Sequence, residues 1–222
     1  MEILNDSSGL RLPRLYLLRH GETDWNVIKR LQGRTDIPIN ERGQVQARRH
    51  GQALRTRLID QFGFTAADLC DELTNWHFVS SPLSRCRETM EIVRGELGLD
   101  PKAYELSNNL VEIGFGDWEG RSWDELRLET PELIAARFAN PWDVVAPKGE
   151  SHTQMQTRVL DWFEALPLKT IAVTHSGPLR IIEGHLSNMD PIEIPHLVAH
   201  QDKFLDVCKG NGGNGMAGFA WV

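Results

Sequence analysis

The sequence predicts an α/β fold, a three-layer sandwich in which helices cover both faces of a mostly parallel central sheet. Short apolar runs at about 14–18, 76–79 and 169–174 are bounded by turn-forming residues, which is typical of buried parallel strands. Longer segments with apolar residues three and four positions apart separate these runs, as in amphipathic helices. Strands that alternate with amphipathic helices indicate an α/β architecture.

The first half of the chain contributes two strands and two helices to this prediction. Residues 1–12 are expected to form a loose leader before the strand at about 14–18. Asn40 is a suitable N-cap for a helix that runs to about residue 60. After the strand at 76–79, Ser81 is expected to cap a second helix with Pro82 in its first position.

The second half predicts two further helices and a terminal hairpin. Ser151 and Gln154 form a capping-box pattern at the start of a helix that extends to about residue 166. A strand at 169–174 follows, and then a helix that begins near Pro178. The last elements are expected to be two strands, at 203–208 and 216–222, joined by a Gly/Asn turn.

Composition limits the classes of protein to which the chain can belong. A length of 222 residues suits a single domain, 1–222. The tryptophan- and proline-rich segment at about 113–149 fits neither the helical nor the strand periodicity and is expected to be an inserted lid. The net charge of −7 argues against binding to nucleic acid or membranes. Three widely spaced cysteines fit neither a disulfide framework nor a zinc site, and with no recognisable secretion signal they favour a cytoplasmic location.

Two histidines stand at the ends of predicted strands. His20 follows the apolar run at 15–18, and His175 follows the run at 171–173. Ligands of open α/β sheets bind in the crevice at the carboxyl ends of the strands. His20 and His175 are therefore expected to share one crevice.

Cationic side chains accompany these histidines. Arg19 precedes His20, and Arg85 lies in the first turn of the helix after the second strand. The positive end of the helix dipole disfavours a cation at that position unless an anion lies between the cation and the helix N-terminus. Guanidinium groups match phosphate oxygens in charge and geometry, and an imidazole can attack phosphorus. A leaving alkoxide then needs a proton, for which Glu112 is the best candidate, although Glu22, Asp117 and Glu119 are nearby carboxyls.

Five segments, in this order along the chain, resemble the histidine phosphatase superfamily, and specifically its phosphoglycerate-mutase-like branch. They are Leu17–Thr23 (LLRHGET) with Asp24-Trp25-Asn26, Leu31–Pro38 (LQGRTDIP), Ser80–Arg85 (SSPLSR), Glu112–Gly120 (EIGFGDWEG) and Thr174–Gly177 (THSG). The resemblance implies a phosphoglycerate mutase-like fold for nearly the whole chain. The sequence departs from the family pattern at Cys86, where alanine is usual, and at Ser176, where glycine is common.

The resemblance also implies roles for the matching residues. His20 would be the phosphorylated nucleophile and Glu112 the proton donor, while Arg19, Arg85 and His175 would bind the transferred phosphoryl group. Substrate-binding positions would be Asn26, Thr23, Gln32, Gly33 and Ser176. No metal or other cofactor is expected, because the cationic side chains supply the positive charge.

These residues predict a histidine acid-type phosphatase, a metal-independent hydrolase that acts on a small phosphorylated metabolite through a phosphohistidine. Related mutases carry basic residues just after the general acid, whereas here the first positive charge after Glu112 is Arg121, which favours hydrolysis. Arg121, Arg127 or Lys148 folding into the pocket would weaken that inference. A mutase, a phosphatase of proteins or phosphopeptides, and a phosphopeptide-binding module without catalysis are the alternatives. A homodimer is left open.

Overall fold

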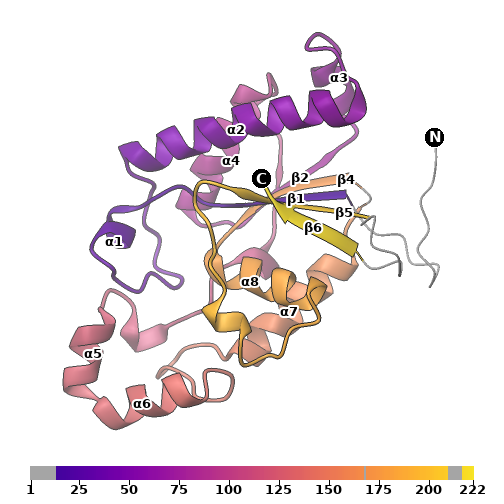
Figure 1. The fold of residues 1–222 in the computed structure, drawn as a ribbon. Helices are drawn as coiled ribbons and strands as arrows, with labels where there is room; N and C mark the ends of the chain where they lie inside the picture. The colour runs from indigo at the N-terminus through magenta and orange to yellow at the C-terminus, as the bar shows by residue number, and fades with distance from the viewer. Residues whose placement is uncertain (1–13, 168, 210–216) are drawn as a thin grey trace.

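The computed structural model describes residues 14–167, 169–209 and 217–222 and has a six-stranded sheet between two layers of helices (Figure 1). The strands lie in the order β3-β2-β4-β1-β5-β6. β1 to β4 are mutually parallel where they pair, and β5 and β6 are antiparallel to their neighbours. The predicted three-layer, mostly parallel sandwich is confirmed. The strands are β1 (Arg14–Arg19), β2 (His77–Ser80), β3 (Glu105–Leu106), β4 (Lys169–Thr174), β5 (Phe204–Lys209) and β6 (Ala217–Trp221).

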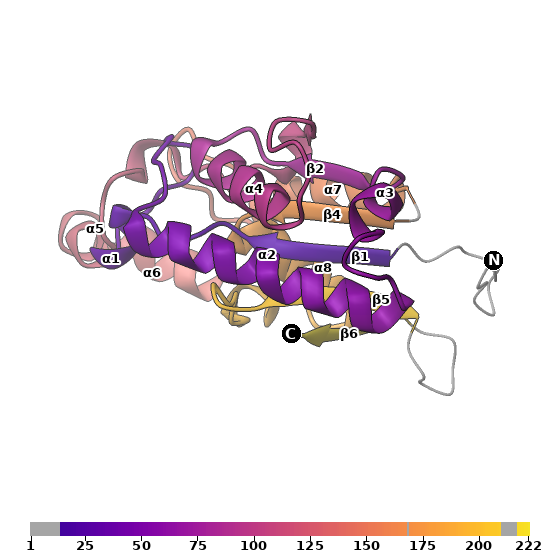
Figure 2. The same ribbon diagram turned by 90° about the horizontal axis from the view of Figure 1, so that it is seen from above.

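Alternation along the strands gives the sheet two apolar faces. Tyr16 and Leu18 of β1 point to a core formed with α2, α3 and α4, whereas Leu15 and Leu17 point to a core formed with α7 and α8. Figure 2 shows the first helical layer from above the sheet. The helices are α1 (Asp24–Val27), α2 (Glu41–Phe62), α3 (Leu69–Leu73), α4 (Ser84–Glu96), α5 (Trp123–Glu129), α6 (Pro131–Ala139), α7 (His152–Glu164) and α8 (Ser176–Leu186).

The predicted helix starts are confirmed at α2 and α7 and are wrong at α4. Asn40 caps α2 by accepting from the backbone N–H of Gly43, and Ser151 and Gln154 form the expected capping box of α7. α4 begins at Ser84, not at Pro82: the Ser81 hydroxyl accepts from His175 at 2.8 Å and from the backbone N–H of Leu83 only at 3.5 Å. The backbone N–H of Ser84 is satisfied by the carboxylate of Asp36, at 2.7 Å.

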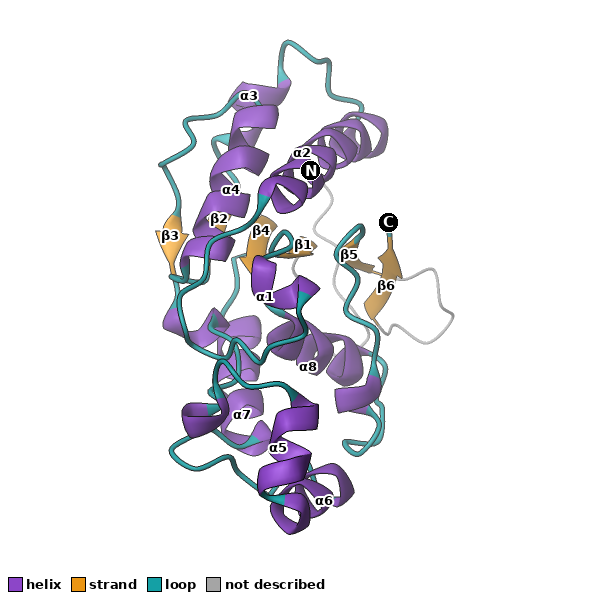
Figure 3. Ribbon diagram, turned by 90° about the vertical axis from the view of Figure 1, so that its left-hand side faces the viewer, coloured by secondary structure: helices purple, strands orange, loops and turns teal. Residues whose placement is uncertain are grey.

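Two other sequence expectations are refined by the structure, and two fall outside the described residues. α8 begins at Ser176, two residues before Pro178, with His175 as its N-cap residue. The segment at 113–149 contains α5 and α6, which lie beside the sheet and not against either face (Figure 3). The leader at 1–12 and the turn between the last two strands fall outside the described residues. Short 3-10 turns complete the fold, at Asn108–Leu110, Gly116–Trp118 and Ile194–His196.

Segment 113–149 has a small core of its own. Trp118, Leu126, Ile134 and Ala146 are buried against one another there, apart from the two cores of the sheet. The carboxyl ends of β1 and β4 point toward α1 and this segment (Figure 1). The space between the strand ends and segment 113–149 is therefore where a ligand site is expected. Within the described residues, no helix is long and apolar enough to cross a membrane.

Candidate active site

His20 and His175 lie side by side at the ends of two adjacent parallel strands. His20 follows β1 and His175 follows β4, and the backbone N–H of His20 donates to the carbonyl of Thr174 over 3.0 Å. Their ring centroids are 5.2 Å apart, and both side chains are buried. The two residues were expected to share one crevice: they meet at one end of the sheet, but of the two only His20 lines the cavity there.

The Arg85 guanidinium joins the histidine pair from the start of α4. Its Nε donates to Nδ1 of His175 at 3.2 Å, and its two Nη atoms donate to the carbonyls of Thr35 and Gly33 at 2.9 and 2.7 Å. The Arg85 side chain is fully buried. Each Nη of a guanidinium carries two hydrogens, so Arg85 keeps N–H groups for a ligand while the protein fixes its position.

Arg19 supplies a second guanidinium, which makes fewer hydrogen bonds to the protein than Arg85 does. Its Nη1 donates to the carbonyl of Ala199 at 2.7 Å, and its buried Nε has no hydrogen-bond partner among the described residues. Burial lowers the pKa of Arg19 to about 10, which leaves the side chain positively charged at neutral pH. Arg19 and Arg85 therefore make the end of the sheet electropositive although the chain as a whole is acidic.

The hydrogen bonds of His20 define which ring nitrogen is free. Nδ1 lies 2.7 Å from the carbonyl of Gly21, which can only accept, so Nδ1 carries the hydrogen. Burial, with the nearby charges of Arg85 and Arg19, lowers the pKa of His20 well below 6.5. His20 is therefore neutral at neutral pH, and its Nε2 presents an unprotonated lone pair.

His175 is hydrogen-bonded on both ring nitrogens, to Arg85 and to Ser81. Its Nδ1 accepts from Arg85, so the hydrogen lies on Nε2, which donates to Oγ of Ser81 over 2.8 Å. The ring is fully buried and is not among the cavity-lining residues. His175 thus orients Arg85, and its expected direct contact with a phosphoryl group stays a prediction.

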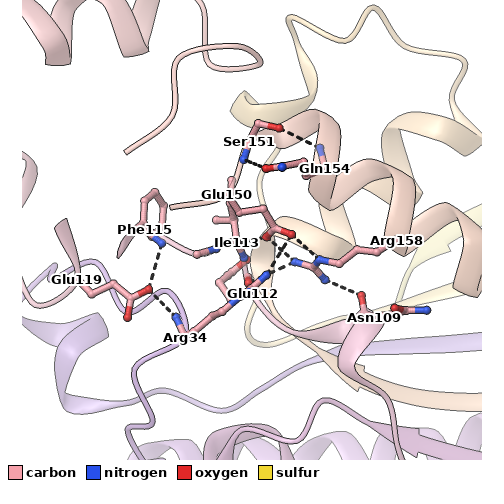
Figure 4. A network of polar contacts seen from close by, with 11 residues as sticks. Arg34, Asn109, Glu112, Ile113, Phe115, Glu119, Glu150, Ser151, Gln154 and Arg158 are labelled. Atoms are coloured by element: carbon pink, nitrogen blue, oxygen red, sulfur yellow. Dashed lines mark hydrogen bonds and ion pairs between the residues drawn. The ribbon is translucent and has the colours of Figure 1, made fainter. Parts of the chain in front are cut away.

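Glu112 is held by a network that fixes the chain on either side of it (Figure 4). Arg158 on α7 pairs with both carboxylate oxygens of Glu150 and also donates to the backbone carbonyl of Glu112. The backbone N–H of Glu150 donates to the carbonyl of Gly114 at 2.8 Å. These contacts tie segment 109–114 to α7, so the Glu112 side chain projects from a fixed backbone.

The other three candidate carboxyl groups form hydrogen bonds or ion pairs outside the cavity. Glu119 bonds the backbone N–H groups of Arg34 and Phe115, Asp117 pairs with Lys148, and Glu22 pairs with Arg42. Among the described residues, Glu112 is the only carboxylate that lines the cavity at the strand ends. The structure therefore favours Glu112 over the alternatives as the acid.

The cavity beside His20 has a volume of about 390 Å³, enough for a small molecule. It lies between the strand ends, α1, segment 113–149 and α8. Its lining residues are Arg19, His20, Asn26, Arg30, Leu31, Gln32, Gly33, Arg85, Glu112, Phe115, Trp123, Arg137, Phe138, Pro141, His152, Ser176, Arg180, Pro195 and His196.

Four of the five expected substrate-binding residues line this cavity. Asn26, Gln32, Gly33 and Ser176 do so, and the buried Oε1 of Gln32 has no partner among the described residues. Thr23 does not line the cavity: it is the N-cap of α1, and its hydroxyl accepts from the backbone N–H of Asn26. The expectation that Thr23 contacts the substrate is therefore not supported by its position.

Three cavity-lining arginines were missed in the sequence: Arg30, which pairs with Glu125, and the two arginines Arg137 and Arg180. Arg137 on α6 donates to the carbonyls of Pro141 and Val144, and Arg180 on α8 donates to the carbonyl of Leu197. Neither forms an ion pair with a carboxylate among the described residues. Arg180 lies four positions after Ser176, on the same face of α8, so helical spacing could have revealed it. Arg137 depends on how segment 113–149 folds.

Three basic residues of segment 113–149 lie outside the cavity, whereas Arg137 of the same segment lines it. Arg121 pairs with Glu125 and Glu129, Arg127 with Asp124, and Lys148 with Asp117. None of the three lines the cavity. In the described part of the chain, no group of three or more histidine, cysteine, aspartate and glutamate side chains is arranged to hold a metal ion.

Comparison with known families agrees with this geometry. The sequence model of the histidine phosphatase superfamily (branch 1) matches residues 15–204. The chain belongs to this superfamily. All five residues expected to be catalytic lie within the matched range.

Proteins similar to this chain include a mutase in sequence and a phosphatase in fold. The 2,3-bisphosphoglycerate-dependent phosphoglycerate mutase of Beijerinckia indica is 28% identical over 191 residues, which are 82% of this chain and 85% of the mutase. Bacillus stearothermophilus YhfR superposes with a TM-score of 0.71 at 27% identity, covering 94% of this chain and 96% of YhfR. The alpha-ribazole phosphatase of Shigella flexneri shares the fold, with a TM-score of 0.70 at 24% identity, covering 94% and 95% of the two chains.

Proposed function

We propose that this histidine phosphatase superfamily member is a metal-independent phosphomonoester hydrolase that acts on a small phosphorylated metabolite through a phosphohistidine. One observation carries the proposal: a neutral His20 with an unprotonated Nε2 lies in the same electropositive cavity as Glu112. Among the described residues, Glu112 contributes the only carboxyl group to this cavity. Nucleophile, acid and phosphate-binding guanidiniums are the parts that phosphoryl transfer to histidine requires.

In the first step, Nε2 of His20 attacks phosphorus and the bond from phosphorus to the leaving oxygen breaks. Glu112 gives its proton to that oxygen, so the alcohol leaves neutral. The carbonyl of Gly21 holds Nδ1–H of the phosphorylated ring, and the guanidiniums of Arg19 and Arg85 stabilise the charge on the phosphoryl oxygens. In the second step, water gives a proton to Glu112 and attacks phosphorus, the P–N bond breaks, and phosphate departs.

Hydrolysis is favoured over mutase activity by the positions of three of the four basic residues of segment 113–149. Arg121, Arg127 and Lys148 are each paired with carboxylates outside the cavity. Mutase activity is the second candidate, because Arg137 and Arg180 line the cavity without carboxylate partners among the described residues and would suit a second anionic group. The cavity volume favours a metabolite over a protein or phosphopeptide substrate. We also propose that the protein is cytoplasmic.

The proposal is tested with purified protein and 4-nitrophenyl phosphate, in the presence and absence of EDTA. We expect hydrolysis that EDTA does not reduce, and an acid-labile phosphoenzyme that can be trapped during turnover. His20→Ala should lower kcat by about 1,000-fold or more and abolish trapping, with an unchanged circular dichroism spectrum. Loss of activity in EDTA, or turnover by His20→Ala, would overturn the mechanism.

A substrate panel separates the alternatives. Sugar phosphates, phosphoglycerates, nucleotides and phosphopeptides are compared by phosphate release, and 3-phosphoglycerate is also tested for isomerisation with 2,3-bisphosphoglycerate as primer. Release of phosphate from a metabolite at the highest kcat/KM supports the hydrolase. Isomerisation that outpaces phosphate release would assign a mutase instead.

A further inference from the structure

The two oxygens of the Glu112 carboxylate have different partners. Oε1 accepts from the backbone N–H groups of Ile113 and Gly177, both at 3.0 Å. Oε2 accepts from the hydroxyl of Ser176 at 2.9 Å. Ser176 and Gly177 are the first two residues of α8, so the carboxylate also lies at the positive end of a helix of 11 residues.

This difference determines which oxygen can carry the transferable proton. A carboxylate oxygen has two lone-pair positions, and two backbone N–H groups, which can only donate, occupy both positions on Oε1. A proton on Oε1 would therefore break one of these bonds. Oε2 has one protein partner and one remaining lone pair, so the proton that Glu112 gives to the leaving group is carried on Oε2.

We propose that Ser176 is a positioning residue for the general acid: its hydroxyl fixes Oε2 so that the proton-bearing lone pair is presented to the leaving oxygen. This inference rests on the proposed function. Without Ser176 the carboxyl group keeps only its two bonds at Oε1 and can pivot about that atom. Glu112 and Ser176 both line the cavity, as positioning of this kind requires.

A hydroxyl suits this position better than a second backbone N–H would. The Ser176 hydroxyl can donate to Oε2 in both protonation states of Glu112, and it can rotate as the proton leaves and returns. Ser176 stands where the family pattern commonly has glycine, which offers no side-chain donor. The family pattern therefore does not by itself imply this hydrogen bond to the general acid.

Gly177 is part of the same arrangement. A Cβ atom at this position would lie 2.3 Å from Oε1 of Glu112 and 2.8 Å from Sδ of Met155. Only glycine lets the helix backbone approach the carboxylate closely enough for its N–H to bond Oε1. Ser176 and Gly177 thus hold opposite oxygens of one carboxyl group from consecutive positions.

The test exploits the dependence of acid catalysis on the leaving group. An alkyl phosphate expels a strongly basic alkoxide that needs the proton, whereas 4-nitrophenyl phosphate expels a stable phenolate that does not. We compare kcat/KM for glycerol 2-phosphate and 4-nitrophenyl phosphate, because this parameter reports phosphoryl transfer to His20 and excludes the later hydrolysis of the phosphoenzyme. Ser176→Ala should lower kcat/KM about 10-fold for glycerol 2-phosphate and less than about 3-fold for 4-nitrophenyl phosphate.

Three further variants make the result specific. Ser176→Thr retains a hydroxyl and should restore at least part of the lost alkyl-phosphate activity, whereas Ser176→Gly should behave as Ser176→Ala. Ser187→Ala is the matched control, because Ser187 lies directly after α8 and its hydroxyl donates to the carbonyl of Glu183, away from the cavity. Its kcat/KM values should equal those of the wild type for both substrates.

Glu112→Gln separates failure of this inference from failure of the proposed function. The inference is overturned if Ser176→Ala and Ser176→Gly lower kcat/KM equally for both substrates, or change neither, while Glu112→Gln selectively damages the alkyl phosphate. In that case Glu112 remains the acid and the proposed function stands. If Glu112→Gln shows no selectivity either, the assignment of the acid fails, and the inference fails with it.

Discussion

The reactivity of His20 depends on which of its nitrogens carries a hydrogen. The Gly21 carbonyl holds the hydrogen on Nδ1, and burial beside Arg85 and Arg19 lowers the pKa of the ring well below 6.5. A lowered pKa keeps the imidazole neutral as the pH falls through 6.5, so Nε2 keeps its lone pair under mildly acidic conditions. The environment thus favours nucleophilic attack over acid catalysis by this residue.

Long-range ¹H–¹⁵N NMR of the free protein tests this state directly. The His20 ring should show a protonated Nδ1 and an unprotonated Nε2 at pH 7, and the pattern should persist below pH 6.5. His20→Asn assigns the signals by removing them. A titration midpoint at or above 6.5, or a hydrogen on Nε2, would contradict the nucleophile proposed here.

The sequence was sufficient for the residues whose role follows from strand ends and recognisable motifs. His20, Arg19 and Arg85 reach the cavity as expected because predicted strands and a predicted helix place them, and Glu112 reaches it as its motif implies. The partners of these residues were not predictable. That Ser176 bonds Glu112 and that His175 orients Arg85 depends on contacts between segments 64 and 90 positions apart.

At the scale of elements, the start of α4 determines where Arg85 lies. The Ser81 hydroxyl accepts a hydrogen bond from His175. The first turn of α4 is capped by the carboxylate of Asp36, which lies in a loop distant in sequence. A carboxylate that accepts from an N–H group at a helix N-terminus also interacts favourably with the helix dipole. Asp36 thus stabilises the helix start immediately before Arg85.

Asp36→Ala should lower the free energy of unfolding by about 1 kcal/mol, because it removes the acceptor for the Ser84 N–H group. Asp36→Asn keeps an acceptor oxygen at this position and should lose less. Urea denaturation monitored by circular dichroism measures both. Equal stability of Asp36→Ala and the wild type would show that the cap contributes nothing.

Most elements could be predicted because their signals are local. Asn40 and the pair Ser151–Gln154 mark helix starts by bonding within one turn of themselves, so sequence alone was enough. Helices α5 and α6 were missed although Ser122 and Glu125 form a capping box and Pro131 begins α6. Their apolar faces pack on a small local core, and that pattern is too short for periodicity to detect.

At the scale of the whole molecule, folding places several histidines in surroundings that disfavour their charged form. Burial lowers the pKa of His50 and of His152 to about 4 and holds those of His20 and His175 well below 6.5. The unfolded chain protonates all four near pH 6.5. Because the unfolded state then binds more protons, acidification stabilises it relative to the folded state.

The free energy of unfolding should therefore fall as the pH is lowered from 6.5 to 5, a window that lies mostly above the range in which carboxylates titrate. Each buried histidine contributes up to about 1.4 kcal/mol per pH unit to this slope. Urea denaturation at pH 7, 6.5, 6, 5.5 and 5 measures the slope, and His50→Leu should reduce it by about 1 kcal/mol per pH unit whatever its effect on stability at pH 7. His50 suits this control because it packs against Phe204, away from the cavity, so its replacement leaves the phosphate-binding residues in place. Stability that does not change across the window would mean that these histidines are protonated inside the folded protein, and the neutral His20 on which phosphoryl transfer depends would be excluded with them.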